Sequence, residues 1–157
     1  MERRRKNQQG LTLVELIVAF TILSLLTTMA IPLARYKVRR ERERELLHSL
    51  REIRNAIDKY KDAADTGKLG IQQKQEAFGY PETLESLVEG VKGAGQVEMK
   101  MKFLRRIPID PFTGKREWGL RSVQDDPATG SWGGQNVFDV YSKTLEKAPD
   151  GKPYAEW

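Results

Sequence analysis

The chain has 157 residues, enough for one modest domain, and carries 27 Lys and Arg against 22 Asp and Glu. It contains no cysteine, which excludes disulfides, zinc–thiolate sites and thiol catalysis. Much of the excess positive charge is local: without the four bases and one acid of residues 1–10, 23 bases and 21 acids remain. A short basic head before an apolar run usually sets membrane orientation, so we expect no nucleic-acid partner.

An apolar segment follows the basic head, from residue 11 to residue 34. As a helix its 24 residues would reach about 36 Å, which exceeds the roughly 30 Å of a hydrocarbon core. Its only ionisable side chain is Glu15. An acid at the bilayer centre costs about 2.5–3.5 kcal/mol, so an intramembrane acid usually has a partner and a function. We therefore predict a membrane-spanning helix over residues 11–34 in which Glu15 has a specific role.

The same helix is expected to continue over residues 35–66. Residues 35–45 are almost entirely charged, and an apolar stripe with helical spacing follows them: Leu46, Leu50, Ile53, Ile57, Tyr60 and Ala64. The opposite face carries charged residues: Arg51, Glu52, Arg54, Asp58 and Lys61. This half should pack on a globular domain. Pro32 lacks a backbone donor and is expected to kink or loosen the helix near the outer edge of the span, whereas Gly67 is expected to end the helix.

Residues 67–157 are predicted to form a small α+β domain. Residues 82–89 indicate a short helix that Gly90 closes. The alternation over residues 97–103 favours a strand, with a helical turn as the alternative. Residues 117–123 and 136–142 are typical of two strands of an antiparallel sheet. A loop rich in Gly, Pro and Asp separates those strands, the segment around Gly93 and Gly95 should also be a loop, and residues 143–157 should be mostly irregular.

No part of the sequence indicates an active site. His48 is the only histidine and lies off the apolar stripe, so we expect it at the surface rather than as a ligand or a base. The glycines around Trp132 form a turn and not a dinucleotide fingerprint. The alternating charges of residues 39–44 are typical of a solvated helix face, although in an assembly they could meet neighbouring subunits. We therefore expect a protein that is not an enzyme.

The N-terminal pattern resembles the class III signal of type IV pilins and their relatives: a basic leader, Gly10, and an apolar helix with Glu at its fifth position. The resemblance implies that a prepilin peptidase cuts between Gly10 and Leu11 on the cytoplasmic side and N-methylates Leu11, so that residues 1–10 are a leader. The family usually has Phe where this chain has Leu11. Pro32 stands where the family usually places a helix-kinking proline.

Cleavage would leave a free ammonium on Leu11, close to the positive end of the helix dipole. Glu15, one turn further on, could pair with that ammonium or with the ammonium of a neighbouring subunit. The second arrangement is satisfied only in an assembly and would set the axial register between subunits. The alternative is an ordinary signal anchor whose Glu15 lies near the membrane interface. A cleaved secretory signal would have an apolar region of only about 7–15 residues.

Residues 107–114, 136–142 and 150–153 resemble segments of the major pseudopilins of type II secretion. The resemblance implies a pilin-like α+β fold, in which a long N-terminal helix packs on a small antiparallel sheet with an irregular C-terminal loop region. In that family the C-terminal loop binds calcium. Asp150 matches one of the family's two Asp ligands, the second is missing, and Glu156 is the acid nearby. Asp125 and Asp126 could contribute if the loops fold together, whereas the alternative is that these acids only form turns.

The resemblance implies a structural subunit that assembles through its N-terminal helix into a periplasmic pseudopilus and so drives protein export across the outer membrane. It implies a single-pass protein of the bacterial inner membrane with its globular domain in the periplasm. The implied partners are other copies of the chain, a prepilin peptidase, minor pseudopilins, the inner-membrane assembly platform and, before assembly, lipid. The alternatives are a type IV or competence pilin acting in adhesion or DNA uptake, and a membrane-tethered enzyme or chaperone.

Overall fold

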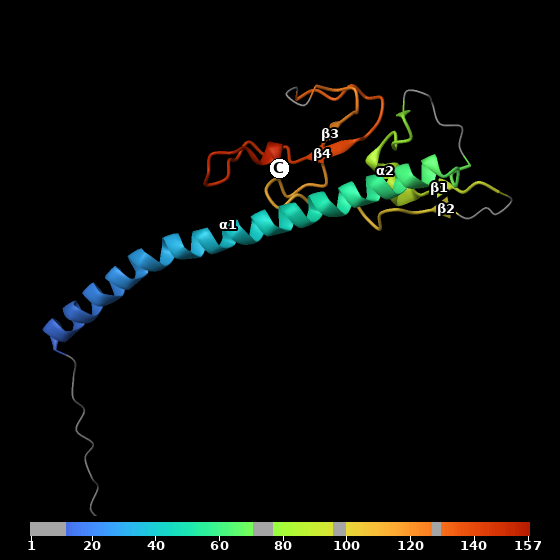
Figure 1. Ribbon diagram of the computed structural model, residues 1–157. Coiled ribbons are helices and arrows are strands. Elements are labelled where there is room, and N and C mark those ends of the chain that lie inside the picture. Colours follow the sequence, from blue (N-terminus) through green and yellow to red (C-terminus); the bar gives the residue numbers. More distant parts are fainter. Residues whose placement is uncertain (1–11, 71–76, 96–99, 127–129) are drawn as a thin grey trace, which may run out of the picture. The chain divides into compact units, whose positions relative to one another are not determined.

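The computed structural model describes residues 12–70, 77–95, 100–126 and 130–157 (Figure 1). Helix α1 spans Leu13–Asp65, α2 spans Leu84–Glu89, and a short 3-10 helix, η2, spans Tyr154–Glu156. The strands in these residues are β1 (Val91–Lys92), β2 (Lys100–Met101), β3 (Gly119–Arg121) and β4 (Asp139–Tyr141). The chain divides into two compact units, Met1–Glu41 and Arg42–Trp157. A long helix with short antiparallel strands confirms the predicted pilin-like α+β fold class.

The first unit holds the apolar part of α1, which is long and apolar enough to cross a membrane by length and composition. The large apolar side chains on this segment are about half to three-quarters exposed, from 48% for Leu16 to 76% for Leu13. The helix continues through Pro32 without a break. Thr21, Thr27 and Thr28 each donate a hydroxyl hydrogen bond of 2.8 Å to the backbone carbonyl four residues earlier. Their hydroxyl groups are therefore satisfied within the helix.

The second unit has its core along the apolar stripe of α1. Ile53 and Ile57 are fully buried, as the spacing predicts, and Ala64 at the end of the stripe is half-buried. The other elements add buried side chains to this face: Leu84, Leu87, Val91, Leu104, Trp118, Val137, Val140, Ala148 and Tyr154. Burial of so much apolar surface on one helix face is what stabilises this half of α1.

Both predicted helix ends are confirmed. Gly67 has a φ of 66°, and the amides of Gly67 and Lys68 donate to the carbonyls of Ala64 and Ala63 at 3.0 Å and 2.9 Å. This is a left-handed helix end of the kind that glycine favours. Helix α2 begins after the N-cap Thr83, whose side chain accepts from the Ser86 amide, and ends at Gly90 with a φ of 82°.

The strands form two separate two-stranded antiparallel sheets. Strands β3 and β4 pair in the register Gly119↔Tyr141, Leu120↔Val140 and Arg121↔Asp139, which confirms that the segments 117–123 and 136–142 contain strands of an antiparallel sheet. Strand β2 confirms part of the strand predicted over residues 97–103, of which 97–99 lie outside the described residues. The sequence missed β1, because glycines flank its two residues; it forms by pairing with β2.

Candidate functional site

The N-terminal end of α1 is the candidate site for processing and assembly. The cleavage residues Gly10 and Leu11 lie outside the described residues, and the description begins at Thr12. The Thr12 hydroxyl oxygen accepts a hydrogen bond of 3.3 Å from the Glu15 amide. Thr12 and Glu15 therefore stand at the spacing of a capping box, and a carboxylate in the first turn complements the helix dipole. The sequence pattern Thr-x-x-Glu could have revealed this local role, which gives Glu15 a function within one subunit besides any function between subunits.

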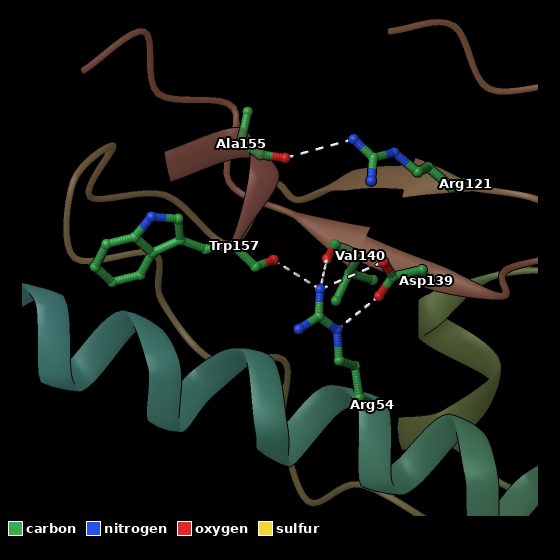
Figure 2. Close-up of polar contacts among 6 residues, drawn as sticks. All are labelled: Arg54, Arg121, Asp139, Val140, Ala155 and Trp157. Carbon is green, nitrogen blue, oxygen red and sulfur yellow. Dashed lines mark hydrogen bonds and ion pairs between the residues drawn. The ribbon is translucent and has the colours of Figure 1, made fainter. Parts of the chain in front are cut away.

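A second candidate region is the contact that holds α1 against β4 and the C-terminal end. The Arg54 guanidinium donates to both carboxylate oxygens of Asp139, at 2.6 Å and 3.3 Å (Figure 2). Its Nη2 also donates to the backbone oxygens of Val140 at 3.2 Å and Trp157 at 2.8 Å. One side chain of α1 thus binds two other parts of the fold, β4 and the C-terminal residue. Arg54 was predicted on the charged outer face, but its side chain is only 35% exposed and is committed to these partners.

Aromatic rings complete the attachment of the C-terminal segment. Tyr154 is fully buried, stacks on Phe112 with ring centroids 4.2 Å apart, and meets Trp157 edge-on at 4.9 Å. Its hydroxyl donates to Glu43 on α1 at 2.7 Å. The predicted irregular tail is therefore irregular in backbone but firmly packed, and residues up to 111 positions apart in sequence hold it.

The segment that resembles the pseudopilins is organised by a buried carboxylate. Asp110 is fully buried and accepts from the Phe112 amide at 2.8 Å, the Thr113 amide at 3.4 Å and the Ser142 hydroxyl at 2.6 Å. Nearby, the Trp118 indole donates to the Pro108 carbonyl at 3.0 Å. The turn between Pro108 and Gly114 is thus bound to the residue that follows β4.

Replacing Asp110 with alanine is expected to destabilise the second unit by about 3 kcal/mol, because the Ser142 hydroxyl and the Phe112 amide would lose their acceptor in a buried place. Thermal unfolding of the purified full chain in detergent measures the loss. The matched control is Asp150→Ala, because exposed Asp150 accepts only a local bond of 3.0 Å from the Lys152 amide in the described contacts. Equal stability of the two variants would contradict the anchoring role of Asp110.

Two of the acids named for calcium, Asp125 and Asp150, accept hydrogen bonds within local turns. The Asp125 carboxylate accepts from the Ser122 amide at 2.7 Å and the Gly133 amide at 3.2 Å, and these bonds lower the pKa of the Asp125 carboxyl below its ordinary value of 3.8. Glu156 lies in η2, and Asp126 lies beside Asp125. Within the described residues, no three His, Asp or Glu side chains are grouped so as to hold a metal ion. Calcium needs about 6–8 oxygens, and the described carboxylates do not converge in this way, so calcium binding stays a prediction.

His48 is exposed on α1, as predicted. It lies in a cleft of about 310 Å³ between the helix and the loop that precedes Asp110. Glu45 and Glu52 line the helix side of this cleft, and Arg106 and Arg116 line its loop side. The sequence did not indicate the cleft, because the residues from its two sides are about 60 positions apart.

The comparisons with known proteins agree with the geometry at both ends of the chain. The family model of the prokaryotic N-terminal methylation motif matches residues 5–31. Over 144 residues, 88% of this chain and 84% of the other, the chain is 27% identical to the type II secretion system core protein G of Pseudomonas aeruginosa. No solved structure matches the chain, and neither similarity is to an enzyme. The chain therefore carries the prokaryotic N-terminal methylation motif and is similar over most of its length to a core protein of type II secretion.

Proposed function

We propose that this protein is a structural subunit of a type II secretion pseudopilus, which a prepilin peptidase processes and which assembles through its N-terminal helix to drive protein export across the outer membrane. The observation that carries the proposal is the methylation motif over residues 5–31, placed on an exposed apolar helix with a single acid. The similarity to core protein G over most of the chain directs the proposal to secretion.

The exposed apolar side chains of α1 need apolar partners, and lipid and other copies of the chain would provide them at different stages. Side chains such as Leu13, Phe20 and Leu26 are between 58% and 76% exposed, a large cost in water at about 25 cal/mol per Å² of apolar area. Lipid would cover them in a stored subunit and the helices of other copies in a fibre. The basic residues before the span would stay in the cytoplasm, and the second unit would then lie in the periplasm.

The assembly step depends on charge neutralisation at the N-terminus. Cleavage before Leu11 would create an ammonium near the positive end of the helix dipole, which is unfavourable for an isolated subunit. Glu15 supplies the only carboxylate of the apolar segment. We propose that it pairs with the ammonium of a neighbouring copy, so that the pair forms only between correctly placed subunits. The prepilin peptidase, minor pseudopilins and the inner-membrane assembly platform would be the other partners.

Mass spectrometry of the protein extracted from its own membranes tests the processing step. We expect a mature chain that begins at N-methylated Leu11 and lacks residues 1–10, together with fibres visible by electron microscopy when the secretion genes are overexpressed. A Gly10→Phe variant should keep the leader, because the peptidase would no longer accept the junction. A wild-type chain that retains Met1 and forms no fibres would contradict the proposal.

A type IV or competence pilin is the alternative, because such a protein would carry the same N-terminal methylation motif. The two functions predict different losses when the gene is deleted. Loss of enzyme secretion with normal DNA uptake and surface adhesion supports the pseudopilus. Loss of uptake or adhesion with normal secretion supports the alternative.

A further inference from the structure

An exposed apolar tip follows β4 in the second unit. Leu145 is 96% exposed, more than any other large apolar side chain among the described residues. A single exposed Leu is ordinary on a protein surface, but this one stands between Lys143 and Glu146, which are also exposed. We call residues 143–146 the Leu145 tip.

The fold holds the Leu145 tip in place. Buried Ser142 precedes the tip and buried Ala148 follows it. The Thr144 amide donates to the Ser142 hydroxyl oxygen at 3.2 Å, and the Glu146 amide donates to the Thr144 hydroxyl oxygen at 3.3 Å. Two successive hydroxyl-capped turns of this kind fix a loop locally. The tip is therefore a preformed protrusion rather than a free tail.

The cleft beside His48 has the complementary shape and charge. Its volume is about 310 Å³, and its loop side presents Ile107 and Ile109, of which Ile109 is 47% exposed. Glu45 and Glu52 lie on its helix side, and Arg106 lies on its loop side. The loop wall is fixed, because the Arg116 guanidinium and the Trp118 indole donate to the carbonyls of Ile107 and Pro108. An apolar group flanked by one cation and one anion would suit this cleft.

No residue of the Leu145 tip lines the cleft of its own molecule. We propose that the Leu145 tip of one copy docks in this cleft of the next copy along the fibre, an inference that rests on the proposed function. Leu145 would contact Ile107 and Ile109. Lys143 would face the two helix acids, and Glu146 would face Arg106.

The geometry of such a contact is suited to a fibre. The tip and the cleft are different surfaces, so a docked pair still presents one free tip and one free cleft. A head-to-tail contact of this type continues into an open helical filament when the rotation between copies does not close a ring. A reciprocal dimer, in which each tip fills the other's cleft, would instead use up both surfaces and leave no site for a third copy.

Cysteine cross-linking of assembled fibres tests the docking. Because the chain has no native cysteine, only the introduced cysteines can react. The test variant is Lys143→Cys combined with His48→Cys, which leaves Leu145 and Glu146 in place. Treatment with a short bismaleimide reagent should give a ladder of covalent multimers on a denaturing gel. The matched control is Lys143→Cys with Lys59→Cys. Lys59 is exposed on nearly the same side of α1 as His48 but about 16 Å further along the helix.

A charge-reversal pair gives an independent readout. Glu146→Arg should lower the fibre yield about tenfold, because it would bring two cations together at the contact. Arg106→Glu in the same chain should restore most of the yield, because the swapped charges attract each other and the effects of the two substitutions are then not additive. Normal fibres with no ladder, or an equal ladder from the Lys59 control, would overturn the docking and leave the pseudopilus standing. Failure of the wild type to form fibres at all would overturn the pseudopilus and the docking together.

Discussion

Glu15→Gln is expected to abolish fibre assembly while leaving membrane insertion and leader removal intact. Glutamine can occupy the third position of a capping box as glutamate does, so the capping part of the local role is preserved, whereas the interaction of the carboxylate with the helix dipole is lost. Only the negative charge is lost. The ammonium of a neighbouring Leu11 would then remain unpaired in an apolar surrounding. A cost of about 3 kcal/mol for an unpaired buried charge corresponds to about a hundredfold weaker association between subunits.

Three variants separate the two roles of Glu15. Glu15→Ala removes the carboxylate but keeps the backbone amide that donates to Thr12, and Thr12→Ala removes that observed hydrogen bond of 3.3 Å while keeping the charge. We expect Thr12→Ala to assemble and both Glu15 variants to remain as monomers in the membrane fraction. Sedimentation of sheared fibres and electron microscopy measure assembly, and carbonate extraction measures insertion. Normal fibres from Glu15→Gln would show that the pairing role is wrong.

Replacing Arg54 with methionine is expected to lower the free energy of unfolding of the second unit by about 2 kcal/mol. The side chains of Arg54 and Asp139 are 35% and 24% exposed, so their pairing is partly screened and falls below the roughly 3–5 kcal/mol of a fully buried broken pair. The substitution also leaves the backbone oxygens of Val140 and Trp157 without this donor. We therefore expect the residues around η2 to become a site of early proteolysis.

The matched control for this variant is Arg51→Met, three residues earlier on the same helix. Arg51 is exposed, and its Nε donates only to the Leu47 carbonyl within the helix at 3.1 Å. Chemical unfolding and limited trypsin digestion of the full chain in detergent compare the two variants. A double variant, Arg54→Met with Asp139→Leu, should recover part of the loss because no lone charge remains. Equal stability of Arg54→Met and Arg51→Met would show that the contacts of Arg54 with β4 and Trp157 do not stabilise the second unit.

The features that the sequence could predict are those that depend on neighbours within one or two turns. The spacing of Leu46, Leu50 and Ile53 identifies the buried face of α1 because helix geometry alone places those side chains together. The apolar segment, the N-terminal motif and the helix end at Gly67 are local in the same sense. Each of these patterns depends only on residues close together in the sequence, and the structure confirms the buried face of α1 and the helix end at Gly67.

The features that the sequence could not predict depend on partners that are distant along the chain. Arg54 is the same residue type as exposed Arg51 one helical turn earlier, and only Asp139, 85 residues later, gives it a partly buried partner. Asp110 resembles an ordinary turn residue until Ser142 packs against it. Tyr154 lies in a segment without any periodicity, yet it is fully buried. A signal for such contacts would require covariation between distant positions, which a single sequence does not hold.

Three of the four threonines of the apolar segment bond to the backbone of their own helix, which has a consequence for how copies recognise one another. Because the hydroxyl groups of Thr21, Thr27 and Thr28 are bonded to the helix backbone, this part of α1 presents a mainly apolar surface to its surroundings. It can therefore exchange lipid acyl chains for the helices of neighbouring copies without leaving these hydroxyl groups unpaired. The choice of partner and the rotation between neighbouring copies must then depend on other parts of the chain, namely the charged N-terminal end of α1 and the second unit.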